Sequence, residues 1–202
     1  MTRWLAEQRL VLASQSAVRR ALLQGAGLAV DVHPADIDER GVEAAAGDIG
    51  PDEAAALLAR EKARAVAARM PGRFVLGADQ TLALGDRRFS KPADRSAARA
   101  HLLDMRGRTH SLHAAIAVAR DGDVLFEHRD AAHLTMRDCS EAFLDEYLDA
   151  AGGAVCKSVG GYQLEGVGVQ LFERIEGAYF TILGLPLLPL LDWLRRERLL
   201  RS

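Results

Sequence analysis

Short apolar runs and longer stretches with helical spacing follow each other along the chain. Short runs bounded by turn residues are typical of strands, and apolar residues three and four positions apart are typical of helices. The pattern predicts strands over 10–14, 29–33, 74–78, 109–120, 124–136, 169–175 and 178–183, with 82–84 as a continuation of the strand 74–78 or as a hairpin arm. It predicts helices over 16–26, 52–70, 95–105 and 140–150, and a last helix that begins at Pro186.

Turn and cap residues support these boundaries. Ser16 and Ser140 each stand where a side-chain oxygen can cap the first turn of a helix. Asp121-Gly122 separates two long strand-like runs, which is a strong hairpin signal. The Ala- and Gly-rich stretch 41–50 indicates a loop. Hairpins combined with strand–helix units predict a mixed α/β fold, with a twisted central sheet and flanking helices.

Composition narrows the class of protein. The 202 residues are enough for one domain, or for two closely associated lobes, with a sizeable core. The net charge of −2 gives no general attraction to nucleic acid or to a membrane surface. The chain has two cysteines and no CxxC pair, so neither a disulfide framework nor a zinc site is expected.

The expected location is the cytoplasm. The chain starts without the long apolar core of a signal peptide. Its longest apolar stretch, TILGLPLLPLL, is too short to span a bilayer and contains two prolines. We therefore expect a soluble cytoplasmic protein, without a nucleic acid or a membrane as partner.

The first candidate for chemistry is LASQSAVRR, in which Ser14 and Ser16 precede a predicted helix that carries Arg19. The first turn of a helix offers free N–H groups and a positive dipole end, which suit phosphate. Serine hydroxyls and an arginine add further donors. The alternative is an ordinary helix cap followed by solvated arginines, because caps are common.

Acidic and basic residues further along the chain add three candidates. Asp38 belongs to an acidic cluster after a predicted strand, where carboxylates could hold a hard cation such as magnesium. The alternative is a solvated acidic loop. Lys62 lies on a predicted helix and either extends to solvent or points its ammonium group into a cleft. Lys91, next to Pro92, could neutralise phosphate or could simply precede a helix.

Asp79 is the most informative acid. In FVLGADQTLAL it follows the apolar run 74–78, at the expected carboxyl end of a strand. Open α/β sheets place functional groups at such ends. A carboxylate there could bind metal or accept a proton from water. The alternative is that Asp79 caps a turn.

Together these pieces resemble the Maf family of nucleoside triphosphate pyrophosphatases, over most of the chain. The motifs occur in family order: LASQSAVRRALL, DIDER, EKARAV, GADQT, a Lys-Pro pair, GRTH, GGYQLEGVG and GLPL. The resemblance implies a single Maf/inosine triphosphatase-like domain, residues 1–202, with two lobes around a cleft. It also implies a homodimer, a nucleoside triphosphate substrate, and a divalent metal cation, magnesium or manganese, as cofactor.

The same resemblance implies roles for single residues. Water attacks the α-phosphorus of the nucleotide, and pyrophosphate and a monophosphate are released. Asp79 corresponds to the catalytic carboxylate, acting as base or metal ligand, and Asp38 to a second acid of the metal site. The expected phosphate-binding residues are Ser14, Ser16, Arg19, Lys62 and Lys91.

Choice of base is expected to depend on a few positions. Gln80 and Glu165 are similar to the branch that acts on 7-methyl-GTP, whereas branches for dTTP and UTP usually carry Thr and Gln there. Glutamate can accept hydrogen bonds from the guanine edge and favours a cationic ring. Val18 departs from both branches, which carry Arg or Trp at that position. A preference for UTP or dTTP therefore remains an alternative.

Two other classes of function stay open. One is a phosphatase with Asp79 as covalent nucleophile, similar to haloacid dehalogenases, although Thr81 stands where those enzymes have a second acid. The other is a regulator of cell division that binds nucleotide without hydrolysing it. Pyrophosphate release separates the pyrophosphatase from both alternatives.

Overall fold

The computed structural model describes residues 4–201, which divide into two compact units. Unit 1 contains residues 4–80, 114–130 and 179–201, and unit 2 contains residues 81–113 and 131–178. The division cuts three long strands, so each of these strands contributes to both units. Among the described residues, no helix combines the length and apolar character needed to cross a membrane.

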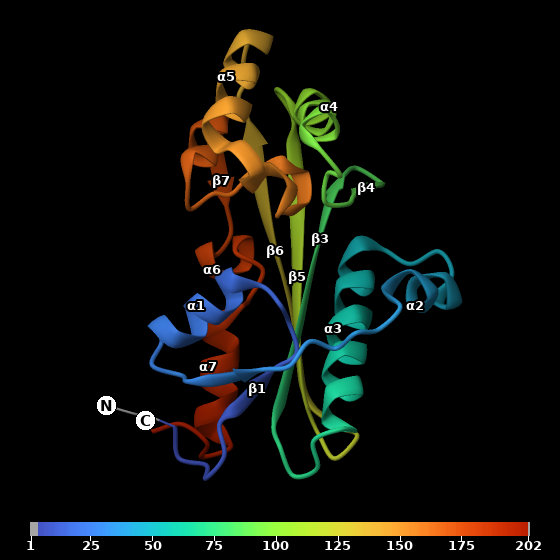
Figure 1. Ribbon diagram of the computed structural model, residues 1–202, viewed down its shortest axis with the longest axis vertical. Helices are drawn as coiled ribbons and strands as arrows, with labels where there is room; N and C mark the ends of the chain where they lie inside the picture. Colours follow the sequence, from blue (N-terminus) through green and yellow to red (C-terminus); the bar gives the residue numbers. More distant parts are fainter. Residues whose placement is uncertain (1–3, 202) are drawn as a thin grey trace. The chain divides into compact units, whose positions relative to one another are not determined.

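Unit 1 is built on a sheet in which short parallel strands lie next to long ones. β1 (Leu10–Leu12) pairs in parallel with both β2 (Val30–Val32) and β3 (Val75–Leu84). β5 (Thr109–Arg120) lies next to β3, and β6 (Asp123–Met136) lies next to β5 (Figure 1). The predicted hairpin between β5 and β6 is confirmed. Both Asp121 and Gly122 have positive φ, as a type I′ hairpin turn requires.

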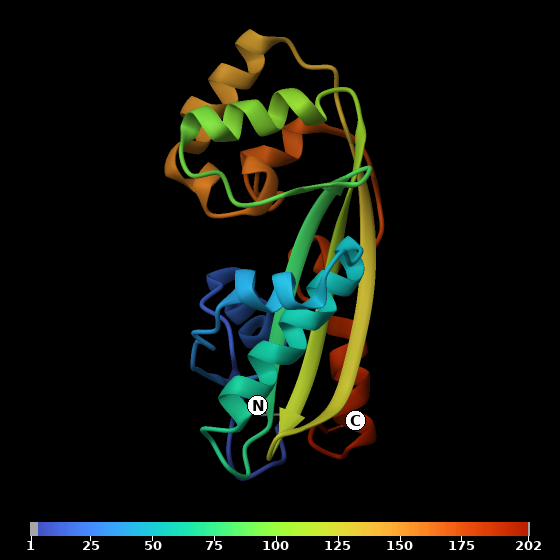
Figure 2. The same ribbon diagram turned by 90° about the vertical axis from the view of Figure 1, so that its right-hand side faces the viewer.

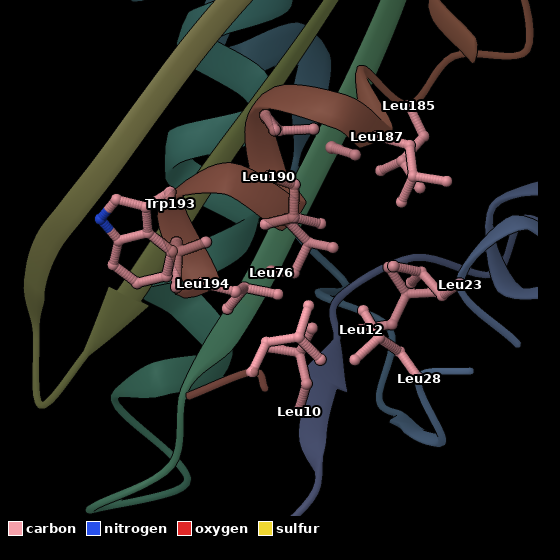
Figure 3. Packing of buried hydrophobic residues seen from close by; sticks show 14 residues of the cluster. Leu10, Leu12, Leu23, Leu28, Leu76, Leu185, Leu187, Leu190, Trp193 and Leu194 are labelled. Carbon is pink, nitrogen blue, oxygen red and sulfur yellow. The ribbon is translucent and has the colours of Figure 1, made fainter. Parts of the chain in front are cut away.

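Helices cover both faces of this sheet. α1 (Ala17–Gly25) and α7 (Leu187–Arg196) pack on one face, and α3 (Pro51–Ala67) packs on the other (Figure 1). The α1/α7 side is filled by large side chains such as Leu23, Leu76 and Trp193 (Figure 3). The α3 side is filled mainly by alanine and valine. Small side chains allow α3 to lie close to the strands.

Gly77 of β3 makes this close approach possible. A Cβ atom at this position would lie 2.0 Å from the Ala59 carbonyl oxygen and 2.7 Å from the Ala63 nitrogen. Both atoms belong to the backbone of α3, so neither can move without moving the helix. A glycine in β3 and alanines in α3 therefore set the distance between the two elements. This distance decides which side chains of α3 can reach β3.

Unit 2 gathers helices around the other halves of the long strands. β4 (Arg87–Phe89) pairs with β3, and β7 (Phe172–Glu176) pairs with β6. α4 (Arg95–Met105) and α5 (Glu141–Ala151) lie side by side (Figure 2), joined by Arg99, whose guanidinium donates to Asp145 and Glu141. Three short 3₁₀ helices follow α5: η1 (Gly152–Cys156), η2 (Val159–Gly161) and η3 (Val167–Leu171).

A buried polar pair ties the glycine-rich stretch of unit 2 to β5. His110 is 1% exposed, and a 2.6 Å hydrogen bond joins its Nε2 and the Tyr162 hydroxyl. Phe172 packs against both rings. Burial lowers the pKa of His110 to about 4. The imidazole is therefore neutral at physiological pH and serves as an anchor.

Several predicted elements are confirmed closely. α4 occupies the predicted residues, and α1 and α5 begin after the predicted caps. The Ser16 hydroxyl accepts from the Arg19 N–H, and the Ser140 hydroxyl accepts from the Phe143 N–H. These signals work because each depends on residues within one turn of the chain.

The predicted loop over 41–50 is wrong, because most of it is helix α2 (Glu39–Ala46). The Asp38 carboxylate caps this helix by accepting from the Gly41 N–H. A Cβ at Gly41 would lie 2.5 Å from Oδ2, the other oxygen of the capping carboxylate, so glycine suits this first-turn position. Gly47, with φ of 76°, ends the helix. The glycines thus mark the two ends of a helix.

The predicted strand over 178–183 is also wrong, because Tyr179–Ile182 form the short helix α6. Its backbone donates within the segment, from Leu183 N–H to Tyr179 and from Gly184 N–H to Thr181. Short apolar runs fit a buried helix turn as well as a strand. The predicted strand over 169–175 begins only at Phe172, because η3 occupies the residues before it.

Candidate functional site

Asp79 lies inside β3, so the prediction that it ends a strand is wrong. The reason lies in the neighbouring strand. β1 pairs with β3 only as far as Leu12, opposite Leu76, and the chain then turns toward α1. Asp79 therefore stands just beyond the carboxyl end of a parallel neighbour, although its own strand continues. Functional groups of parallel sheets gather at such a place.

The Lys62 ammonium joins two carboxylates. Lys62 is 9% exposed and Asp79 is 8% exposed. Lys62 Nζ donates to Asp79 Oδ1 at 2.6 Å and lies 2.8 Å from Glu39 Oε1. The first contact depends on the close approach of α3 to β3 at Gly77. The second brings in the first residue of α2, whose side chain is about half exposed. A buried charged pair thus continues to the surface through Glu39.

The surroundings of Asp79 change its proton affinity. Burial raises the pKa of Asp79, because the charged form loses water. The positive charges of Lys62 and Arg19 oppose this shift, and Glu39 adds to it. Burial likewise lowers the pKa of the Arg19 guanidinium, and the charges of Asp79 and Glu39 oppose that effect. Asp79 is therefore a better proton acceptor than an exposed aspartate.

Ser14, Ser16 and Arg19 come together at the start of α1. Ser14 Oγ accepts from the Ser16 N–H at 3.3 Å and from Arg19 Nη1 at 3.0 Å. Arg19 Nη1 also donates to the Ala78 carbonyl, and Nε donates to the Gly184 carbonyl, both at 2.8 Å. The guanidinium thus ties α1 to β3 and to the segment before α7. These bonds use Nε and Nη1 of the guanidinium.

Gln80 is also engaged with the segment before α7. Its Nε2 donates to the carbonyl groups of Thr181, at 3.0 Å, and Ile182, at 2.9 Å. Gly184 has φ of 79°, and a Cβ there would lie 3.3 Å from Arg19 Nη2 and 3.4 Å from Gln80 Oε1. Gln80 and Arg19 thus both lie against this glycine and hold residues 181–184 next to the strand that carries Asp79.

Glu39 is the site residue that the sequence interpretation missed. The motif DIDER contains Asp38 and Glu39 near its end, and Asp38 was the residue predicted for the metal site. In the structure Asp38 is exposed and caps α2, whereas Glu39 contacts Lys62. The cap signal could have indicated this difference, because an aspartate that caps a helix turns back onto its own first turn. The next side chain is then the one that projects away from the cap.

The remaining predicted residues lie in different surroundings. Val18 is half-buried in α1 of unit 1. Lys91 and Glu165 belong to unit 2 and are exposed. Lys91 lies between β4 and α4, and Glu165 lies in the turn that precedes η3. The contacts of unit 1 thus bring together Ser14, Ser16, Arg19, Lys62, Asp79 and Gln80.

The donors around Lys62 are few but chemically suited to a hard cation. Within residues 4–201, no group of three or more His, Cys, Asp or Glu side chains could hold a metal ion. Asp79 and Glu39 nevertheless direct oxygen atoms at the same ammonium group. Magnesium is commonly held by one or two carboxylates, together with water and substrate phosphates. Two carboxylates therefore fit a cation that arrives with a polyphosphate.

A known protein family matches the chain. The family model described as "Maf-like protein" matches residues 9–197, which is most of the chain. The chain belongs to the Maf-like protein family. The match includes every residue of the site in unit 1, from Ser14 to Gly184.

Relatives in the Maf-like family carry informative names. A protein of Rhodopseudomonas palustris (strain BisB18), named "Nucleoside triphosphate pyrophosphatase", is 58% identical over 99% of both chains. A protein of Rhizobium etli, named "7-methyl-GTP pyrophosphatase", is 54% identical over 93% of this chain and 95% of its own. Among solved structures, a HAM1 protein of Coxiella burnetii gives a TM-score of 0.44 at 20% identity, covering 65% of this chain and 74% of that one.

Proposed function

We propose that this chain is a nucleoside triphosphate pyrophosphatase, which hydrolyses its substrate to a nucleoside monophosphate and pyrophosphate. The observation that carries the proposal is the buried Lys62 ammonium held between Asp79 and Glu39. In a Maf-like protein whose relatives have pyrophosphatase names, this is a coherent centre for phosphate chemistry. It combines a cation for the phosphates with a carboxylate for water.

Each residue has a defined task in the proposal. Asp79 accepts a proton from the attacking water, which its burial favours by raising its pKa. Lys62 balances the negative charge that gathers on the phosphates as the bond to pyrophosphate breaks. Ser14, Ser16 and the first turn of α1 offer hydroxyl and N–H donors for phosphate oxygens. Lys91 of unit 2 is a further proposed phosphate ligand.

A divalent cation, magnesium or manganese, fits the two carboxylates. Asp79 and Glu39 would hold it, and Asp38 stays a predicted ligand that already caps α2. When bound, such a cation withdraws negative charge from phosphate oxygens. Lys62 contacts both carboxylates in this structure, and would therefore shift toward the substrate when they share a cation.

The proposed base is 7-methylguanine. Support comes from Gln80 and Glu165 and from the name of the Rhizobium etli relative, which is 54% identical. A glutamate favours a cationic ring over a neutral pyrimidine. Val18 cannot stack on the base as an indole would, so this position supplies no cation–π contact. A homodimer remains a prediction.

Hydrolysis of a nucleotide panel tests the proposal. The purified protein, with magnesium or manganese, is given 7-methyl-GTP, GTP, UTP and dTTP, and pyrophosphate and orthophosphate are measured separately. We expect equal amounts of pyrophosphate and monophosphate, with the highest kcat/KM for 7-methyl-GTP. Stepwise orthophosphate release would indicate a phosphatase, and binding without turnover would indicate a regulator. A clear preference for UTP or dTTP would contradict the proposed base.

A further inference from the structure

Residues 181–184 are held by side chains from three separate elements of unit 1. Gln80 of β3 donates to the carbonyls of Thr181 and Ile182. Arg19 of α1 donates to the carbonyl of Gly184. Asp130 of β6 accepts a hydrogen bond from the Thr181 hydroxyl. Such a dense set of polar ties on four residues fixes their position more firmly than apolar packing alone would do.

These ties leave Gln80 with little capacity to read a base directly. An amide side chain has two N–H donors and one carbonyl acceptor. Here Nε2 donates to two backbone carbonyls, at 3.0 and 2.9 Å, so both donors are used within the protein. Only Oε1 remains for a ligand. Any effect of residue 80 on the choice of substrate therefore acts indirectly, through the position of residues 181–184.

The tie between Thr181 and Asp130 reaches the same segment independently. Thr181 is 0% exposed, so its hydroxyl cannot touch a nucleotide. Asp130 stands on a different strand from Gln80. Removing the hydroxyl therefore loosens the segment without changing the atoms of Gln80, Arg19 or Asp79. A substitution at Thr181 therefore tests the position of the segment without changing a group that could contact the nucleotide.

We propose that residues 181–184 form a segment that determines base specificity, and that Gln80 and Thr181 are positioning residues acting through it. The proposal rests on the proposed pyrophosphatase function. The segment is tied to Gln80 and Arg19. Gln80 follows Asp79 in sequence, and Arg19 also donates to the carbonyl of Ala78, the residue before Asp79. A shift of the segment thus moves groups beside the reacting phosphate without removing any of them.

The test compares Gln80→Ala, Thr181→Val and the double variant. The readout is the ratio of kcat/KM for 7-methyl-GTP to kcat/KM for UTP, together with the ratio of their dissociation constants. A loss of folded protein lowers both members of a ratio equally, so a merely structural defect leaves the ratio unchanged. We expect about a fivefold change for Thr181→Val, the size of one neutral hydrogen bond, and about tenfold for Gln80→Ala.

The double variant decides between positioning and contact. If both residues act through the segment, the double variant changes the ratio by about tenfold, no more than Gln80→Ala alone. Independent effects would multiply to about fiftyfold and would overturn the proposal. Thr181→Ser keeps the hydroxyl donor and should keep the wild-type ratio. Thr135→Val, which removes a hydroxyl bonded to Thr109 in unit 2, is the matched control.

Failure of the two proposals can be told apart. If the wild-type protein released no pyrophosphate from any nucleotide, the proposed function would be overturned. The ratio of dissociation constants would then decide whether residues 181–184 determine base specificity. Absence of both turnover and binding would overturn both proposals. An active wild-type protein with unchanged ratios in Thr181→Val would overturn the role of the segment alone.

Discussion

Both units bury polar side chains, but they bury different kinds. Unit 1 buries the oppositely charged Lys62 and Asp79, and Glu39 extends their contact to the surface. Unit 2 buries His110 and Tyr162, which share a hydrogen bond between neutral groups. Burial is the largest influence on the pKa of Asp79 and on the pKa of His110, and in both residues it favours the neutral form. In unit 1 the positive charges of Lys62 and Arg19 oppose this effect of burial on Asp79. In unit 2 burial alone accounts for the pKa shift of His110.

The difference between the two buried pairs distinguishes a catalytic role from a structural one. A buried charge pair is expensive to desolvate, and apolar residues of similar volume would often give equal or greater stability. Its presence next to the start of α1 is therefore best explained by a reaction that needs both charges. A neutral His–Tyr pair costs little and fixes the glycine-rich stretch of unit 2. The two pairs also predict opposite dependences on pH.

Asp79→Asn should give the largest effect. The amide cannot accept a proton from water and carries no charge for a cation, so we expect hydrolysis to fall by about a thousandfold. Nucleotide binding should persist, because Lys62 and the start of α1 are unchanged. Pyrophosphate release and equilibrium binding measure the two quantities. Undiminished hydrolysis would show that Asp79 takes no part in the reaction. The buried pair of unit 1 would then have a structural role, like the His110–Tyr162 pair of unit 2.

Gly77→Ala tests how unit 1 brings its charges together. The added Cβ would meet the backbone of α3, so we expect a loss of about 3 kcal/mol or more in the free energy of unfolding. Denaturant unfolding measures the loss. Gly25→Ala is the control: no atom lies within 4 Å of its added Cβ, and alanine favours a helix, so stability should be equal or slightly higher. Equal stability of both variants would contradict the close approach.

His110→Gln tests the pH dependence expected of unit 2. The folded-state pKa of about 4 lies below the ordinary value of 6.5, so the unfolded chain binds the proton more readily. Stability from this group is thus present above pH 6.5 and is lost as pH falls toward 4. Between pH 8 and pH 5 the wild-type protein should lose about 2 kcal/mol more than the variant.

The control for His110→Gln is His33→Gln, which removes an exposed imidazole from unit 1. The His110→Gln curve is compared with the curve of this variant, which also lacks one imidazole. For Asp79, whose pKa is raised, the sign is reversed: its contribution favours the folded state as pH falls. A His110→Gln curve parallel to the wild-type curve would show that the imidazole does not titrate as a buried group.

Tyr162→Phe should give the smallest effect. It leaves the ring contacts with Phe172 but removes the hydroxyl, so His110 Nε2 loses its partner. We expect a loss of about 1 kcal/mol in the free energy of unfolding. Thermal or denaturant unfolding at pH 7.5 measures it. A loss as large as that of Gly77→Ala would mean that the neutral pair is more than an anchor.

Local sequence signals predicted much of the fold. The caps Ser16 and Ser140 and the turn Asp121-Gly122 act within a few residues, and the structure confirms them. The helix over 39–46 was missed because its end-marking glycines resemble loop residues. Helix α6 was missed because four residues are too few to show a clear period.

The site was predictable in its residue types but not in its contacts. Asp79 and Lys62 were expected near phosphate, and the structure joins them by a hydrogen bond. The contact of Glu39 with Lys62, and those of Gln80 with Thr181 and Ile182, join residues far apart in the chain. No local pattern encodes such pairs. They follow from the packing of α2 on α3 and of the segment before α7 on β3.

The distance along the chain between Gln80 and its partners has a consequence for biosynthesis. Thr181 follows Gln80 by 101 positions, and Gly184 follows Arg19 by 165. A growing chain therefore carries Lys62, Asp79 and Arg19 long before it carries the carbonyl groups that hold Gln80 and Arg19 in place. We expect nascent chains that stop before residue 181 to lack an ordered centre. Nucleotides would then be hydrolysed only after residue 184 has left the ribosome, so unfinished chains would not consume them.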